Sequence, residues 1–254
     1  MADRILKAWR GDASGGGFVE YRIETSSGMV VLDLILKAQA EVAPDLACRW
    51  NCKAGKCGSC SMEINGKPKL ACMTRLSDYP EGQTITVQPL KAFPVIRDLV
   101  TNVKWNYEQK KRITPFTPPR RPEGDHRMMQ VDVDRIQEFR KCIECFLCQD
   151  VCHVLRDHHK SDRFVGPRFM IHLAQLEMHP LDTVDRIERV RDDYGSGFCN
   201  ITRCCTEVCP EHIQITDNGI IPLKERVVSR FYDPIAIVMR KVFGTDNRRL
   251  DTGA

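Results

Sequence analysis

The chain is organised around one stretch, Lys141-Cys142-Ile143-Glu144-Cys145-Phe146-Leu147-Cys148-Gln149-Asp150-Val151-Cys152. Its four cysteines have the spacing C-x2-C-x2-C-x3-C, which is typical of proteins that bind iron–sulfur clusters. The first three thiolates of such a run hold one cubic cluster, whereas the fourth thiolate binds a second cluster. The spacing therefore predicts a second cysteine run elsewhere in the chain.

The second run reads Cys199-Asn200-Ile201-Thr202-Arg203-Cys204-Cys205-Thr206-Glu207-Val208-Cys209-Pro210. It has the same frame, except that Thr202 stands where a cysteine would be. Cys209 can return to the first cluster, so we predict a 4Fe-4S cluster held by Cys142, Cys145, Cys148 and Cys209. Three thiolates then remain beside a hydroxyl, which favours a 3Fe-4S cluster held by Cys152, Cys199 and Cys205.

A third group of cysteines lies in the N-terminal part of the chain. It has the spacing C-x4-C-x2-C, followed after eleven residues by a fourth cysteine. This plant-type spacing predicts a 2Fe-2S cluster held by Cys52, Cys57, Cys60 and Cys72. Gly55 and Gly58 permit the backbone angles of a tight loop whose N–H groups point at the sulfurs.

Two cysteines fall outside these frames. We expect Cys48 to be a small, partly buried residue beside the cluster loop. Cys204 is adjacent to Cys205 and could ligate the third cluster and turn it into a cube. Against this, neighbouring residues of a helix project about 100° apart and rarely meet one small target. Among the histidines, His153 is a candidate for tuning the third cluster or accepting a proton, whereas the others are expected to be ordinary surface or hydrogen-bonded residues: His158, His159 and His212.

The composition is that of a globular chain with room for two domains. The chain has 254 residues, of which 42% are hydrophobic and 28% charged. It shows no signal peptide and no apolar run near the roughly 18 to 20 residues that cross a bilayer. We therefore expect it to face the cytoplasm, where thiols stay reduced. Eleven of the 13 cysteines fall into groups of four, four and three, which favour iron–sulfur clusters over disulfides and over structural zinc sites.

The first part of the chain is predicted to be rich in strands. Alternating residues predict two strands that form a hairpin around Gly15-Gly16-Gly17, and Asn65-Gly66 predicts a second hairpin. Val31, Leu34, Ile35 and Ala38 have helical spacing and predict one short helix across the sheet. The expected strands are 4–9, 18–24, 61–64, 69–73 and, as the last one, 84–88.

The second part of the chain is predicted to be helical. Residues 112–122 contain four prolines and predict an extended connector before it. Further helices are expected from Pro167, over 182–191, over 220–231, and over 233–243 with Asp233 as N-cap. The fold class is therefore α+β, with three expected segments: a domain at 1–107, a connector at 108–130 and a helical domain at 131–254.

The chain combines plant-type spacing with two interlocked cysteine runs, one of which lacks a cysteine. In this combination it resembles the iron–sulfur subunit of succinate dehydrogenase and fumarate reductase. The resemblance covers nearly the full chain and implies the three ligand sets given above. It also implies a β-grasp plant-type ferredoxin domain followed by an all-α bacterial-ferredoxin-like domain.

The resemblance further implies an electron-transfer function, without a substrate pocket in this chain. Electrons from the FAD of a flavoprotein subunit would pass through the three clusters to a quinone at a membrane anchor, in a succinate:quinone oxidoreductase of the respiratory chain and the tricarboxylic acid cycle. The subunit would lie peripherally on the cytoplasmic face of the inner or plasma membrane, held by its partner subunits. No nucleic-acid partner is expected.

Three positions depart from the family pattern. His153 replaces a usual proline, Val154-Leu155-Arg156-Asp157 replaces a stretch that often contains tryptophans, and Asn200 replaces a frequent histidine. The quinone contacts therefore stay unassigned, and an anchor with haem b that uses menaquinone becomes plausible. Two alternatives remain open, which are the iron–sulfur subunit of a fumarate reductase or other flavoprotein complex and a free-standing ferredoxin-type carrier.

Overall fold

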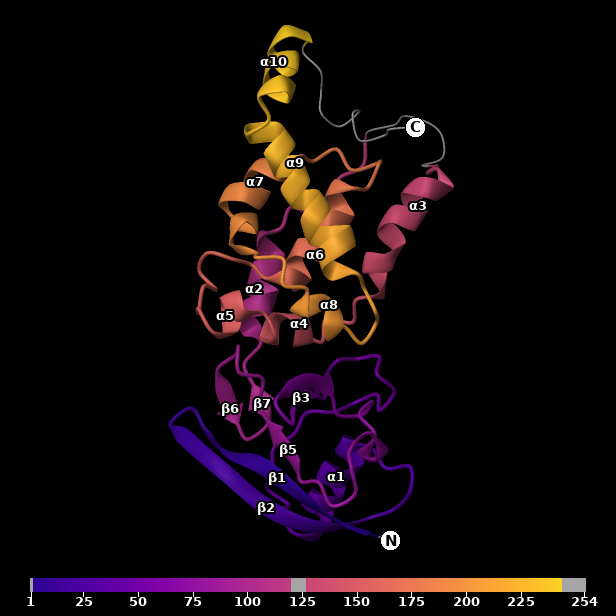
Figure 1. Cartoon of the computed structure of the whole chain (residues 1–254), viewed down its shortest axis with the longest axis vertical. Coiled ribbons are helices and arrows are strands. Elements are labelled where there is room, and N and C mark those ends of the chain that lie inside the picture. The colour runs from indigo at the N-terminus through magenta and orange to yellow at the C-terminus, as the bar shows by residue number, and fades with distance from the viewer. Residues whose placement is uncertain (1, 120–126, 244–254) are drawn as a thin grey trace.

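The computed structural model describes residues 2–119 and 127–243. Parts of the predicted connector (120–126) and of the predicted helical domain (244–254) lie outside the described residues. Within the described ranges the chain has an α+β fold, with the strands gathered at one end of the molecule and most helices at the other (Figure 1). No helix in these ranges is both long enough and apolar enough to span a bilayer.

The N-terminal part forms a seven-stranded sheet with the strand order β4-β3-β5-β1-β6-β7, and β2 pairs with β1 beside this path. β1 and β5 are parallel, whereas the other pairs are antiparallel. The strands are β1 (Ala2–Asp12), β2 (Gly15–Thr25), β3 (Ser61–Ile64), β4 (Lys67–Leu70), β5 (Ile85–Gln88), β6 (Val95–Arg97) and β7 (Val100–Thr101).

The first hairpin is confirmed, but the predicted position of its turn is wrong. The chain turns at Ala13 and Ser14, and the three glycines lie inside β2. Asp12 accepts hydrogen bonds from the backbone N–H and hydroxyl of Ser14, which stabilises this turn. A Cβ atom at Gly16 would lie 2.3 Å from the carbonyl oxygen of Arg10, so glycine permits close strand pairing there.

The core of this part lies between the sheet and α1 (Val31–Glu41), as the helical spacing predicted. The fully buried side chains of Leu34, Ile35 and Ala38 belong to one cluster with those of Leu6 and Ile85. The predicted hairpin at Asn65 and Gly66 is also confirmed. β5 is not the last strand, because β6 and β7 follow it.

The remaining elements are mostly helical. A helix that the sequence did not predict, α2, directly follows the sheet. The helices are α2 (Lys104–Arg112), α3 (Gln130–Gln137), α4 (Leu147–Asp150), α5 (His153–Arg156), α6 (Pro167–Glu177), α7 (Ile187–Asp192), α8 (Cys204–Glu207), α9 (Ile221–Phe231) and α10 (Pro234–Phe243). Short 3-10 turns lie at Leu76–Asp78, Glu138–Lys141 and Ser196–Phe198, and a π-helix at Ile215–Ile220 leads into α9.

Two helix starts illustrate how side chains set the boundaries. Asp233 Oδ1 accepts hydrogen bonds from the N–H groups of Ile235 and Ala236, which confirms the predicted N-cap. The predicted helix over 182–191 begins only at Ile187, because Asp182 accepts a hydrogen bond from the N–H group of Val184. Such local hydrogen bonds compete with helical ones.

The two parts of the molecule are joined through buried polar groups. Glu63 on β3 is fully buried, and its carboxylate lies 3.0 Å from the guanidinium of Arg156 on α5. Asp150 at the end of α4 accepts a hydrogen bond from the N–H group of Ala92 at 2.9 Å. Burial, with repulsion from Glu63, raises the pKa of Asp150 to about 7. The sheet and the cysteine-bearing helices are thus one packed unit.

Candidate metal centres

The first candidate centre lies in the loop before β3. The N–H groups of Ala54 and Lys56 lie 3.4 Å and 3.3 Å from Cys52 Sγ, and the N–H group of Cys72 lies 3.4 Å from Cys60 Sγ. Lys53, Gly55 and Gly58 have positive φ angles of 54°, 68° and 69°, which fold the loop back on itself. The loop therefore presents N–H donors to sulfur, as cluster-binding loops require.

One thiol in this loop has a lowered pKa, which favours its metal-binding form. Burial acts to raise the pKa of Cys57, but hydrogen bonds from Ser59 and Cys52 outweigh it and lower this pKa to about 6. The thiolate, which is the metal-binding form, is thus favoured at neutral pH. Cys48 lies half-buried before the loop, as expected, and burial raises its pKa to about 12.

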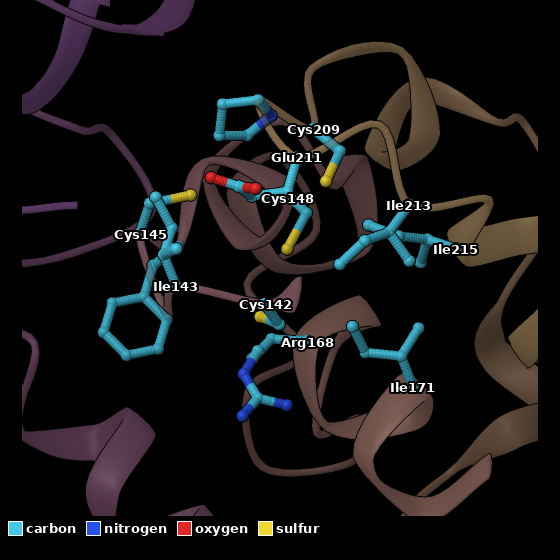
Figure 2. A pocket seen from close by; sticks show the side chains of 12 residues that line it. Cys142, Ile143, Cys145, Cys148, Arg168, Ile171, Cys209, Glu211, Ile213 and Ile215 are labelled. Atoms are coloured by element: carbon cyan, nitrogen blue, oxygen red, sulfur yellow. The ribbon is translucent and has the colours of Figure 1, made fainter. Parts of the chain in front are cut away.

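The second candidate centre is a cavity inside the helical part. Figure 2 shows the sulfurs of Cys142, Cys145, Cys148 and Cys209 around it. Most of the remaining wall is apolar and consists of Ile143, Phe146, Ile171, Pro210, Ile213 and Ile215, and the charged side chains of Arg168 and Glu211 also line it. The structure therefore brings together the four cysteines that the spacing grouped, although Cys209 is 61 residues beyond Cys148.

The third candidate centre is a neighbouring cavity. Its wall contains the predicted Cys152, Cys199 and Cys205 and also Cys204, which the spacing left outside the set. Thr202 lies in the same wall, as do His153 and Asn200, whose side-chain nitrogens are 3.1 Å apart. The other three histidines singled out in the sequence are exposed: His158, His159 and His212.

Two short helices link cysteines of the second cavity to cysteines of the third. α4 contains Cys148 of the second centre and is followed by Cys152 of the third. α8 follows Arg203, contains Cys205 of the third centre and ends before Cys209 of the second. Each run thus contributes to both cavities, as the spacing predicts for interlocked clusters.

The two runs also share a backbone feature that the sequence did not reveal. The second and fourth residues after the first cysteine have positive φ in both runs: Glu144 (55°) and Phe146 (61°), and Ile201 (58°) and Arg203 (62°). Non-glycine residues seldom adopt this conformation, and it commonly marks functional loops. None of the four is glycine, so no sequence signal distinguished them.

A buried arginine beside the second cavity was likewise not predicted from the sequence. Arg168 on α6 contributes to the cavity wall, and only 8% of its side chain is exposed. Its Nη2 atom lies 2.7 Å from Glu144 Oε1, but among the described residues its Nε atom has no hydrogen-bond partner. Against the effect of burial, hydrogen bonds from Lys110 and Arg168 lower the pKa of Glu144. A fixed positive charge therefore adjoins the four thiols.

The first and second centres are in direct contact. A Cβ atom at Gly58, in the first loop, would lie 2.7 Å from the Cα atom of Cys145 in the second centre. Lys56 of the same loop forms an ion pair of 3.0 Å with Glu211, whose side chain lines the second cavity. The three groups of cysteines are thus arranged in series, with the second group in the middle.

The donor set fits the chemistry of a cluster. Burial raises the pKa of Cys60, Cys145 and Cys152 to about 12, so these thiols need an adjacent cation to become thiolates. Within the described ranges, no three His, Cys, Asp or Glu side chains converge closely enough to hold a single ion. The sulfurs instead surround cavities, which suits a multi-atom iron–sulfur core.

Comparisons with known proteins find cluster-binding families over both parts of the chain. Residues 5–108 match the family described as 2Fe-2S iron-sulfur cluster binding domain, and residues 138–213 match the 4Fe-4S dicluster domain. These matches confirm the predicted order of a two-iron domain followed by a helical cluster-binding domain.

Whole-length relatives are also known. The chain is 32% identical over 224 residues to the fumarate reductase iron-sulfur subunit of Mycobacterium tuberculosis, which covers 84% of this chain and 89% of the relative. It is 30% identical to the succinate dehydrogenase [ubiquinone] iron-sulfur subunit 1, mitochondrial, of Oryza sativa, over 76% of this chain and 69% of the relative. A chain in the structure of the Mycobacterium smegmatis Sdh1 complex in the apo form is 61% identical, with a TM-score of 0.90, over 92% of this chain and 99% of that chain.

Proposed function

This chain belongs to the family of iron–sulfur subunits of succinate dehydrogenase and fumarate reductase, and we propose that it conducts electrons in a succinate:quinone oxidoreductase. Its role is that of an electron-transfer subunit of an oxidoreductase complex. The observation that carries the proposal is the second cavity, which four cysteines from two distant runs surround.

Eleven cysteines are proposed as cluster ligands. Cys52, Cys57, Cys60 and Cys72 would hold a 2Fe-2S cluster; Cys142, Cys145, Cys148 and Cys209 a 4Fe-4S cluster; and Cys152, Cys199 and Cys205 a 3Fe-4S cluster. When bound, the clusters supply one-electron redox chemistry. The chain's own residues hold them in sequence, direct N–H groups at the sulfurs and exclude water with apolar walls. The domain folds proposed are β-grasp and bacterial-ferredoxin-like, respectively.

The serial arrangement of the three centres supports a path for electrons through the subunit. Electrons would enter at the first centre from the FAD of a flavoprotein subunit, cross the Gly58–Cys145 contact to the second, and leave from the third to a quinone. His153 and Asn200 at the third cavity are unlike the usual family residues, which supports an anchor with a different quinone site that uses menaquinone and contains haem b.

The C-terminal helices support a peripheral position on a membrane anchor. α10 has a row of exposed apolar side chains, consisting of Ile235, Val238, Met239, Val242 and Phe243. Such an exposed apolar stripe is unusual for a free-standing carrier and suits an interface with an anchor subunit. We therefore propose that the subunit lies at the cytoplasmic face of the membrane, held by its partners. Fumarate reduction is the alternative direction of the same chemistry.

Electron paramagnetic resonance of the purified complex tests the proposal. The oxidised complex should give a three-iron signal, and reduction should add a two-iron signal. Cys57→Ala should remove the two-iron signal and spare the three-iron signal, whereas Cys48→Ala should leave both unchanged. Survival of the two-iron signal in Cys57→Ala would refute the first ligand set, and a preparation with little iron or acid-labile sulfide would refute the function.

A further inference from the structure

The third cavity contains a thiol that the proposed three-iron cluster does not use. Cys204 lines this cavity together with Cys152, Cys199 and Cys205. Its Sγ atom lies 3.2 Å from the hydroxyl oxygen of Thr202. Four thiols therefore share one cavity, and the fourth one is in contact with the residue that replaces a cysteine of the frame.

The position of Thr202 identifies which corner of the cluster this thiol faces. In the first run, the equivalent position is Cys145, whose sulfur lines the second cavity. By this equivalence, Thr202 occupies the position from which a fourth cysteine would hold the corner that a three-iron cluster lacks. A sulfur 3.2 Å from the Thr202 hydroxyl lies within reach of the same corner.

The internal repeat provides a comparison for Cys204. Its counterpart five residues after the first cysteine of the first run is Leu147, a buried side chain that does not line the second cavity. Cys204, in contrast, lines the third cavity and is only half-buried. Cys204 is also the first residue of α8 and follows the left-handed Arg203. The objection that adjacent helical residues diverge therefore applies less strictly here.

We propose that the third centre reversibly binds a fourth divalent metal ion, with the thiolate of Cys204 as its ligand. This inference deepens the proposed function and depends on it. The preferred ion is Fe²⁺ or another thiophilic divalent cation, because thiolate and sulfide are soft donors. Thr202 is exposed, so the corner is accessible to ions from solvent.

The binding step balances without an added oxidant or reductant. The three-iron core is first reduced by one electron, which the proposed flow from the flavoprotein subunit supplies, and then carries no net charge. It next takes up Fe²⁺ while the Cys204 thiol loses its proton to solvent. An iron–sulfur bond forms between the new iron and the thiolate, and the resulting four-iron core carries two positive charges. Loss of this iron reverses the step.

The test uses the whole complex and compares the wild type with Cys204→Ala. Each is reduced anaerobically with dithionite, incubated with Fe²⁺, freed of excess iron and mildly reoxidised. In the wild type, the three-iron resonance should fall and one iron atom per complex should be gained. Cys204→Ala should require at least about tenfold more Fe²⁺, because the loss of even a second-shell partner lowers metal affinity 10–100-fold. Cys48→Ala is the matched control and should behave as wild type.

The outcomes separate the inference from the function on which it rests. Equal conversion of wild type and Cys204→Ala, or no conversion in either, would overturn the role of Cys204 and leave the electron-transfer function intact. Absence of any three-iron resonance in the untreated oxidised wild type would overturn the cluster assignment and this inference together.

Discussion

The charge of Arg168 is the feature of a single side chain that bears most directly on electron transfer. This guanidinium lines the second cavity, where it is nearly excluded from water. A positive charge near a cluster stabilises its reduced form, because reduction adds negative charge. Glu144 offsets part of this effect through its ion pair with Arg168 at 2.7 Å.

Replacing Arg168 by methionine is therefore expected to lower the midpoint potential of the four-iron cluster by on the order of 50 mV, from Coulomb's law at an effective dielectric constant near 20. Arg168→Lys keeps the charge and should shift the potential less. A redox titration followed by electron paramagnetic resonance measures both values. Identical shifts of the midpoint potential in the two variants would show that the shape of the side chain, and not its charge, determines the potential.

Gly58 determines how closely the first two centres approach. Gly58→Ala introduces both a strained φ of 69° and a Cβ atom 2.7 Å from the Cα atom of Cys145. Gly82 has a similar φ of 76° and open space around it, so Gly82→Ala reports the strain alone.

We expect Gly58→Ala to destabilise the folded subunit by about 1–3 kcal/mol more than Gly82→Ala, the usual cost of overpacking. It should also slow electron transfer between the two-iron and four-iron clusters, because the loop must move away. Chemical denaturation and freeze-quench spectroscopy measure these effects. Equal stability of the two variants would contradict the close contact.

Among the elements, α6 contains a histidine whose burial affects stability. His172 lies on this helix beside the interior, and burial, with the nearby positive charge of Arg168, lowers its pKa to about 4. In the unfolded chain this histidine takes up a proton near its ordinary pKa of 6.5, whereas in the folded chain it stays neutral until about pH 4. The folded state therefore loses stability as the pH falls below about 6.5.

For His172→Gln we predict a flatter dependence of stability on pH between 7.5 and 5.5. The difference at pH 5.5 should be up to about 1.4 kcal/mol, which is one pKa unit of linkage. The midpoint of thermal unfolding, recorded across this range, measures the effect. His158 is exposed, and His158→Gln should leave the slope unchanged. If the stability of His172→Gln depends on pH as steeply as that of the wild type, this histidine is not the source of the pH dependence.

The elements also show what the sequence could and could not predict. Cysteine spacing grouped the side chains that line the second cavity, because ligand spacing is set by the short loops themselves. The hairpin at Asn65-Gly66 and the N-cap at Asp233 were predictable for the same local reason. β6, β7 and α2 were not, since such short elements depend on contacts with distant residues such as the Asp12–Arg97 pairing.

Local patterns also failed where a side chain acts through distant partners. Arg168 follows a helix-initiating proline and looks like an ordinary first-turn residue, but its burial depends on the cavity wall. The presence of Cys204 in the wall of the third cavity also depends on distant residues, because Cys152 in the same wall comes from the other run.

At the scale of the whole molecule, the strand-rich and helical parts present different surfaces to partners. α10 lies at the end of the molecule opposite the sheet (Figure 1). Its apolar side chains have the i, i+3, i+4, i+7 spacing of one helix face. Val238 and Val242 are 58% and 65% exposed, so this face is available for a partner.

The double variant Val238→Glu/Val242→Glu should lose most of its association with the proposed membrane anchor, because two charges would be buried at the interface. The proposed cluster ligands lie in other elements, so the cluster spectra should be unchanged. Lys241→Glu, on the same helix, is the control for charge alone and should remain with the membrane fraction. Quantitative co-purification measures the result, and retention of the double variant would place the anchor elsewhere.

The exchange of cysteines between the two runs has a consequence for biosynthesis. Because Cys152 and Cys209 each cross to the cavity of the other run, a nascent chain that ends before residue 199 has no complete set of donors for either helical-domain cofactor. Iron delivered at that stage would meet an incomplete set of cysteine ligands. On the proposed ligand sets, we therefore expect maturation of these two cofactors to wait until the second run has left the ribosome, whereas the N-terminal cofactor can be installed during translation.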